Sequence, residues 1–132
     1  MLVPIVIRDP STARAYRFLN TETPRLAISD FAAAEFASAV ARRVRMNEVT
    51  TESARRAFVA LDALATRVAV WAETSAIDVR RAEEFVRRLD LPLRAPDALH
   101  IAIVERIGAA LMTFDDKMAQ AATRLGMEVA AA

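Results

Sequence analysis

The chain has 132 residues, a net charge of +1, and 55% hydrophobic against 27% charged residues. This composition is typical of one packed domain, and we expect residues 1–132 to form it. The absence of cysteine and the single histidine, His100, exclude disulfides, a cysteine nucleophile and a multi-histidine zinc site within one chain. A metal site would therefore use oxygen ligands, which suit Mg²⁺ or Mn²⁺. Since no secretory signal or charge-free run of ~20 residues is present, we expect a cytoplasmic protein without a membrane span.

In chain order, short apolar runs alternate with amphipathic stretches, and this alternation predicts an α/β fold with a parallel sheet covered on both faces. Three starts carry cap signals: Asp9 before Pro10, Asp30, and Ser75 with Asp78 as a capping box. The charged face of the helix that begins after Ser75 predicts a solvated surface. Strands are predicted over 25–29, 68–71, 109–114 and 127–129, and helices over 9–19, 31–46, 50–66, 76–89, 97–107 and 116–125, while 2–7 is too short to assign.

Glu35 is the first carboxylate of interest. It lies among alanines early in the helix predicted over 31–46, and the positions three and four residues further on hold Ser38 and Ala39, which are not basic. A carboxylate beside an apolar face is costly unless water, a cation or a metal ion stabilises it. Glu35 therefore either points to water near the positive end of the helix or binds a cation.

Two further acidic positions lie in the last third of the chain. Asp97 begins an apolar-periodic stretch that stops at Gly108, and Asp115 with Asp116 follows the apolar run 109–114. Capping alone explains an aspartate at a helix start. The carboxyl ends of parallel strands, however, gather distant residues into one crevice.

We therefore expect three acids to converge: Glu35, Asp97 and Asp115. Clustered carboxylates repel one another, and a divalent cation removes this conflict. Such an ion orients a phosphate and activates water, which is the usual chemistry for cutting phosphodiesters. No glycine-rich phosphate loop supports a different chemistry.

The segments APDALHIA (95–102) and LMTFDDKMA (111–119) resemble the C-terminal half of PIN-domain ribonucleases, particularly VapC-type toxins. The segment 27–40, with Ala34-Glu35-Phe36, resembles their second acidic motif, so the resemblance covers essentially the whole chain. It implies a three-layer α/β/α fold with a small parallel sheet and an endoribonuclease that depends on Mg²⁺ or Mn²⁺. Such proteins cut RNA, often form homodimers or higher oligomers, and are often inhibited by a small antitoxin protein.

Residue by residue, the resemblance assigns roles to the acids. Glu35, Asp97 and Asp115 match three of the family's four acidic positions, as catalytic residues and metal ligands. Asp116 would assist as a further ligand, and Thr113 matches the small hydroxyl residue before the last acid. His100 belongs to the matching pattern but fits a structural role better, given its helical spacing beside the core.

The N-terminal segment departs from the family pattern. The family opens with a strand that ends in its first acid, whereas MLVPIVIRDP (1–10) resembles the apolar helix that follows that strand. We therefore expect the first strand and first catalytic aspartate to be missing. A missing acid would weaken metal binding and activity, and unpaired strand edges would favour self-association.

Two other interpretations stay open. In the first, the chain is a catalytically impaired PIN-like module that binds a partner protein or itself. In the second, which has less support, it is a small helical DNA-binding protein. In the nuclease interpretation arginines steer the RNA backbone, although each is equally explained as a solvated helix residue. The candidates are Arg8, Arg14, Arg42, Arg43 and Arg45.

Overall fold

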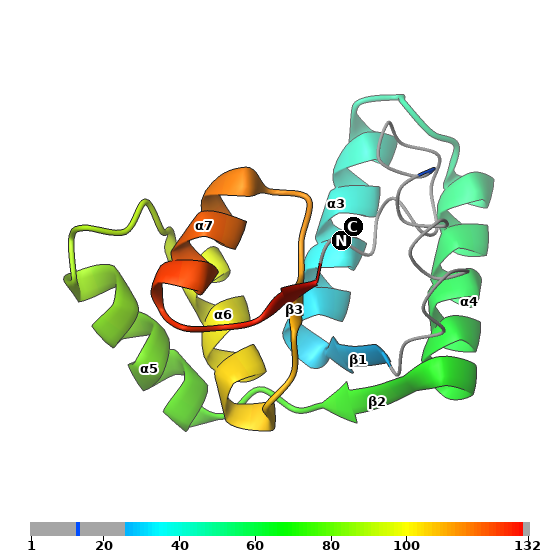
Figure 1. Ribbon diagram of the computed structural model, residues 1–132. Helices are drawn as coiled ribbons and strands as arrows, with labels where there is room; N and C mark the ends of the chain where they lie inside the picture. The colour runs from blue at the N-terminus through cyan, green and yellow to red at the C-terminus, as the bar shows by residue number, and fades with distance from the viewer. Residues whose placement is uncertain (1–12, 14–25, 131–132) are drawn as a thin grey trace. The chain divides into compact units, whose positions relative to one another are not determined.

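The computed structural model describes Ala13 and residues 26–130 (Figure 1). The segment expected over 2–7, and that over 9–19 apart from Ala13, lie outside the described residues. The expectation of a missing first strand and first acid falls on the same N-terminal part of the chain. By the density of its internal contacts the chain divides into two compact units, Met1–Trp71 and Ala72–Ala132.

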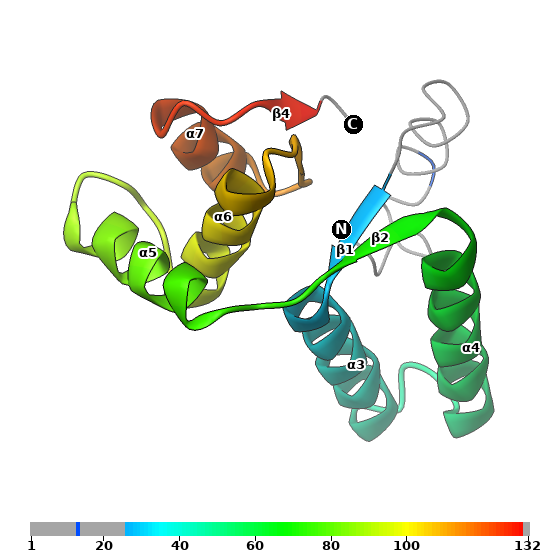
Figure 2. The same ribbon diagram turned by 90° about the horizontal axis from the view of Figure 1, so that it is seen from below.

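The first unit pairs two helices beside a small sheet. Its elements are β1 (Leu26–Ser29), α3 (Asp30–Arg45), α4 (Thr51–Val68) and most of β2 (Ala69–Ala72). Strands β1 and β2 are hydrogen-bonded neighbours, and α3 and α4 lie side by side as an antiparallel pair (Figures 1 and 2). The helices meet through an edge-to-face contact between Phe36 and Phe58, with ring centroids 6.1 Å apart. The buried core consists of Ile28, Phe36, Val40, Ala54, Ala57 and Leu61.

The cap of α3 differs from the expected one. Ser29 still has extended backbone (φ −84°, ψ 153°), and its side chain accepts a hydrogen bond from the Ala32 amide at 3.0 Å. Asp30 is already the first helical residue, where its charge favours the positive helix end. The expectation that Asp30 is the cap is therefore wrong, because the helix begins one residue earlier than predicted, at Asp30 itself.

The second unit contains three helices and a short parallel ladder. Its elements are α5 (Ala76–Arg87), α6 (Ala95–Ile107), β3 (Leu111–Met112), α7 (Asp116–Arg124) and β4 (Val129–Ala130). Strands β3 and β4 run parallel, which fits the α/β expectation. Alanines at four core positions of α6 and α7 let these elements pack closely. The buried core consists of Ala82, Phe85, Leu91, Ala98, Ile101, Ala102, Leu111, Met118, Ala121 and Ala122.

Helix α6 begins two residues before the predicted start. Arg94 is the extended N-cap residue and Pro96 lies in the first turn. Proline is tolerated there because a first-turn amide needs no partner within the helix. Asp97 is consequently the third helical residue rather than the first. The helix ends as expected at Gly108, whose φ of 62° is the left-handed geometry that glycine adopts without strain.

Leu89, just beyond α5, also has left-handed backbone, with φ of 61°, and the residue is 89% exposed. A leucine in this geometry costs roughly 1–2 kcal/mol, whereas glycine is the usual residue after a helix C-cap. We expect Leu89→Gly to raise the free energy of unfolding by about 0.5–1 kcal/mol, after the larger entropy of an unfolded glycine is subtracted. Urea unfolding of both proteins measures this, and Leu89→Ala, which keeps the strain, is the control that should gain nothing.

Candidate functional site

Asp115 is fixed by local hydrogen bonds just beyond the end of β3. One carboxylate oxygen, Oδ1, accepts hydrogen bonds from the amides of Lys117 at 2.8 Å and Met118 at 3.0 Å, so Asp115 is the N-cap of α7. The Asp115 amide in turn donates to the hydroxyl of Thr113 at 3.1 Å. The Thr113 hydroxyl therefore has a structural role, because it orients the backbone at Asp115.

Asp97 is held in a similar way at the start of α6. Its Oδ2 accepts a hydrogen bond from the Arg94 amide at 3.3 Å, across the first turn of the helix. The side chain is half-buried, whereas those of Asp115 and Asp116 are exposed. Both Asp97 and Asp115 thus lie at the N-terminal, positive ends of helices.

The two aspartates come from the same end of the second unit. Helix α6 runs in one direction and β3 returns beside it in the other, so the start of α6 and the end of β3 lie at one end (Figure 1). Asp97 is in the first turn of α6, and Asp115 with Asp116 follows β3. The topology therefore brings the C-terminal acids of the sequence prediction to one end of the unit.

These carboxylates suit a hard cation. Each uses one oxygen to hold its own helix start, and within the described residues Asp97 Oδ1 and Asp115 Oδ2 accept no hydrogen bond. Oxygen donors of this kind fit Mg²⁺ or Mn²⁺. Within either unit, the described residues contain no cluster of three or more histidine, cysteine, aspartate or glutamate side chains of the kind that holds a metal ion.

Glu35 belongs to the first unit, where it is exposed on the second turn of α3. Its convergence with Asp97 and Asp115 therefore stays a prediction. His100 is half-buried on α6. Among the predicted RNA-steering arginines, Arg42 and Arg45 are exposed in the last turn of α3.

That last turn also gives the arginines a structural explanation. The Nε of Arg43 lies 4.0 Å from a carboxylate oxygen of Glu48, beyond the helix end. Cations near the carbonyl end of a helix stabilise it whether or not RNA binds. Arg8 and Arg14 lie outside the described residues.

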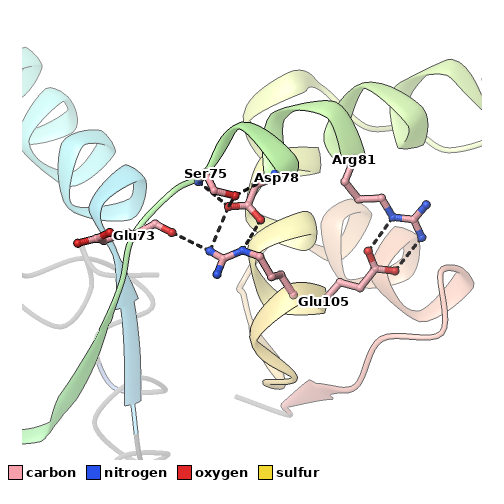
Figure 3. A network of polar contacts seen from close by, with 6 residues as sticks. Glu73, Ser75, Asp78, Arg81 and Glu105 are labelled. Carbon is pink, nitrogen blue, oxygen red and sulfur yellow. Dashed lines mark hydrogen bonds and ion pairs between the residues drawn. The ribbon is translucent and has the colours of Figure 1, made fainter.

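An ion-pair network that sequence reasoning missed joins α5 to α6 (Figure 3). The side chain of Asp78 is buried, and its carboxylate accepts hydrogen bonds from Arg106 Nε at 2.7 Å and from Arg106 Nη2 at 3.1 Å. Ser75 donates to the same carboxylate through its amide and hydroxyl, and Arg106 also donates to the carbonyl of Glu73 at 2.7 Å. The capping box of Ser75 and Asp78 is confirmed, but no local pattern indicates a partner 28 residues away.

A second ion pair lies beside the first. Arg81 donates from Nε and Nη2 to both oxygens of Glu105 at 2.7 and 2.8 Å, and from Nη1 to Glu84 at 2.6 Å. Its guanidinium also lies 4.6 Å from the ring centroid of Phe85. The expectation of a merely solvated charged face on α5 is therefore wrong for Arg81, because the arginine spans two helices and covers an aromatic ring.

Asp78 makes the stability of the protein depend on pH. Burial raises the pKa of Asp78, but the hydrogen bonds from Arg106 and Ser75 outweigh burial and hold this pKa below its ordinary value of 3.8. Because the folded pKa is below the unfolded one, the ionised carboxylate contributes stability above the ordinary value and loses it as the pH falls through the folded pKa. Hydrogen bonds from Arg81 likewise lower the pKa of Glu105.

We expect the wild-type free energy of unfolding to fall steeply below about pH 4. Asp78→Asn should be less stable near neutral pH but show a shallower slope in acid, with Glu105 supplying the remainder. Denaturant unfolding between pH 7 and pH 2.5, within the range of ordinary carboxyl pKa values, measures both slopes. If the free energy of unfolding fell equally steeply with pH in both proteins, Asp78 would not be a source of the pH dependence.

The chain is an α/β protein with short parallel strands, and its acidic residues follow a strand or lie in the first turn of a helix. Sequence comparison identifies the protein family that has these features. Residues 1–124 match the PIN domain family, and the chain belongs to that family. It is also 32% identical over 133 aligned residues to Ribonuclease VapC46 of Mycobacterium tuberculosis (strain ATCC 25618 / H37Rv), an alignment that covers 98% of this chain and 91% of that protein. The prediction of a VapC-type PIN domain is thus confirmed.

No helix in the described part of the chain is both long and apolar enough to cross a membrane.

Proposed function

We propose that this chain is a divalent-metal-dependent endoribonuclease and the toxin of a toxin–antitoxin pair. Membership of the PIN domain family and the likeness to a ribonuclease named VapC46 support this proposal. The structural observation that carries it is the pair of aspartates at one end of the second unit, each with one carboxylate oxygen that the described residues leave available. RNA is the substrate, and a small antitoxin protein is the regulatory partner.

The site would use residues that are far apart in the sequence. Asp97 and Asp115 would hold Mg²⁺ or Mn²⁺ together with Glu35, and Asp116 would assist. When bound, the ion supplies an activated water and stabilises charge on the phosphate. Thr113 would orient Asp115 through the hydrogen bond that its hydroxyl accepts from the Asp115 amide. We further propose that residues 1–132 act as one domain and self-associate as a homodimer or higher oligomer.

Cleavage of a structured RNA with and without a divalent cation tests the function. We expect internal cleavage with Mn²⁺ or Mg²⁺, its loss on addition of EDTA, and recovery when the cation is restored in excess. The Glu35→Gln variant, which keeps the shape of the side chain but not its charge, should lose most of this activity. If the chain neither cleaves RNA nor binds Mn²⁺ at millimolar concentration, the nuclease proposal fails and the partner-binding module is favoured.

A further inference from the structure

Asp78 is the only charged side chain that is buried in the described part of the chain, with 1% exposed. Its pairing with Arg106 has the two-pronged geometry of the strongest arginine–carboxylate contacts. The carboxylate has no place in the proposed chemistry, since it lies at the start of α5 and is fully occupied by Arg106 and Ser75. Such a buried group needs an explanation, because ion pairs buried in a protein often add little net stability.

The two ion pairs between α5 and α6 are reciprocal. Helix α5 contributes the acid of one pair and the arginine of the other, Asp78 and Arg81, and α6 contributes the partners, Arg106 and Glu105. The apolar contact between these helices is rich in alanine and is less demanding of one alignment. A slip of α5 by about one turn would set Arg81 against Arg106 and Glu84 against Glu105. Like charges would meet in both places, so the pairs specify one register.

This register determines where Asp97 lies. Helix α6 is continuous from Ala95 to Ile107, with Asp97 in its first turn and the ion pairs in its last. A continuous helix carries an axial displacement from one end to the other, and a slip of one turn moves every residue by about 5.4 Å. Metal and catalytic groups tolerate displacements of only about 0.5 Å. The position of Asp97 therefore depends on contacts at the far end of its helix.

We propose that Asp78 and Arg106, supported by Arg81 and Glu105, are positioning residues that set the place of Asp97 in the metal site by fixing the register of α6 on α5. This inference rests on the proposed function, because it names residues that act on the same site. Asp78 and Arg106 act through α6 and do not touch the substrate or the metal ion.

Conservative variants test the proposal. Arg106→Lys keeps the charge but loses the planar fork, and Asp78→Asn keeps the shape but loses the charge. Arg87→Lys is the matched control, because Arg87 pairs with Glu83 at 2.7 Å within the exposed face of α5 and does not reach α6. Each protein is measured in three ways: the dissociation constant of Mn²⁺ by calorimetry, the amide resonance of Arg94 without metal, and the thermal unfolding midpoint.

We expect both variants of the buried pair to bind Mn²⁺ about tenfold more weakly than the wild type. Altering residues that support metal ligands without binding the metal themselves commonly lowers metal affinity to this extent. The Arg94 amide donates to Asp97, so its resonance should shift in metal-free Arg106→Lys and Asp78→Asn. Arg87→Lys should match the wild type in both measurements.

A merely structural role predicts something else. The unfolding midpoint would fall, but the folded variants would bind Mn²⁺ as tightly as the wild type and keep the Arg94 resonance, and this result overturns the proposal. If the wild type itself binds no Mn²⁺ and cuts no RNA, the proposed function fails. The Arg94 resonance then still decides whether the ion pairs reach Asp97, and an unchanged resonance in Arg106→Lys overturns the positioning role.

Discussion

Asp115→Asn is expected to lower metal-dependent RNA cleavage by at least about 100-fold while the protein stays folded, since under the proposed function Asp115 is a ligand to the catalytic ion, and such a ligand supplies several kcal/mol of stabilisation. Asparagine caps helices about as well as aspartate. The neutral side chain therefore keeps the hydrogen bonds to the amides of Lys117 and Met118 but loses the charge that the ion requires. Initial rates at saturating Mn²⁺, with the unfolding midpoint of the same samples, measure the two effects separately.

Glu128→Gln is the matched control for this substitution. Glu128 is an exposed carboxylate of the same unit, but it comes just before β4, whereas Asp115 comes just after β3. Because β3 and β4 are parallel, these two positions lie at opposite ends of the ladder. Activity of Asp115→Asn close to that of Glu128→Gln would show that Asp115 is a cap and nothing more.

Arg106→Met is expected to lower the free energy of unfolding by roughly 3 kcal/mol, the low end of the range for breaking a buried pair, since Arg106 keeps some contact with water. Methionine replaces much of the arginine stem but leaves the Asp78 carboxylate, 1% exposed, without its counter-ion. It also removes the donor to the carbonyl of Glu73. Urea unfolding at neutral pH, followed by circular dichroism, gives this difference.

The same substitution in an exposed pair provides the comparison. Arg87→Met breaks the contact between Arg87 and Glu83, whose side chains are 77% and 58% exposed, and should cost about 0.5 kcal/mol or less. Equal losses in the two variants would mean that burial of Asp78 adds nothing, and would remove the physical basis for a register-fixing pair.

Local features of the fold were predictable from the sequence. The capping box of Ser75 and Asp78, the end of α6 at Gly108 and the cap of α7 at Asp115 each depend on residues within one turn of one another, and all three are confirmed. Boundaries were less accurate where two residues compete for one task. Ser29 caps α3 in place of Asp30, and α6 accepts Pro96 in its first turn.

Long-range contacts could not be predicted in this way. The partner of Asp78 lies 28 residues away and that of Arg81 lies 24 residues away, and a helical charge pattern does not distinguish a solvated arginine from one that spans two helices. For the candidate site, the parallel pairing of β3 and β4 is the expected one. The meeting of Glu35 with the two aspartates depends on packing between distant parts of the chain, which periodicity does not encode, and it stays a prediction.

Asp115 is the N-cap of α7 and, under the proposed function, also a metal ligand, and this combination has a consequence for mutations that inactivate the protein. A codon for aspartate becomes one for asparagine by a single nucleotide change, and at this position the product would keep its helix cap. Under the proposed function, the silenced protein would still be folded and could still capture antitoxin. By binding antitoxin, it would act as a decoy and free active copies of the same toxin in the cell. An inactivating mutation at Asp115 would therefore lower the amount of free antitoxin even when active copies are present.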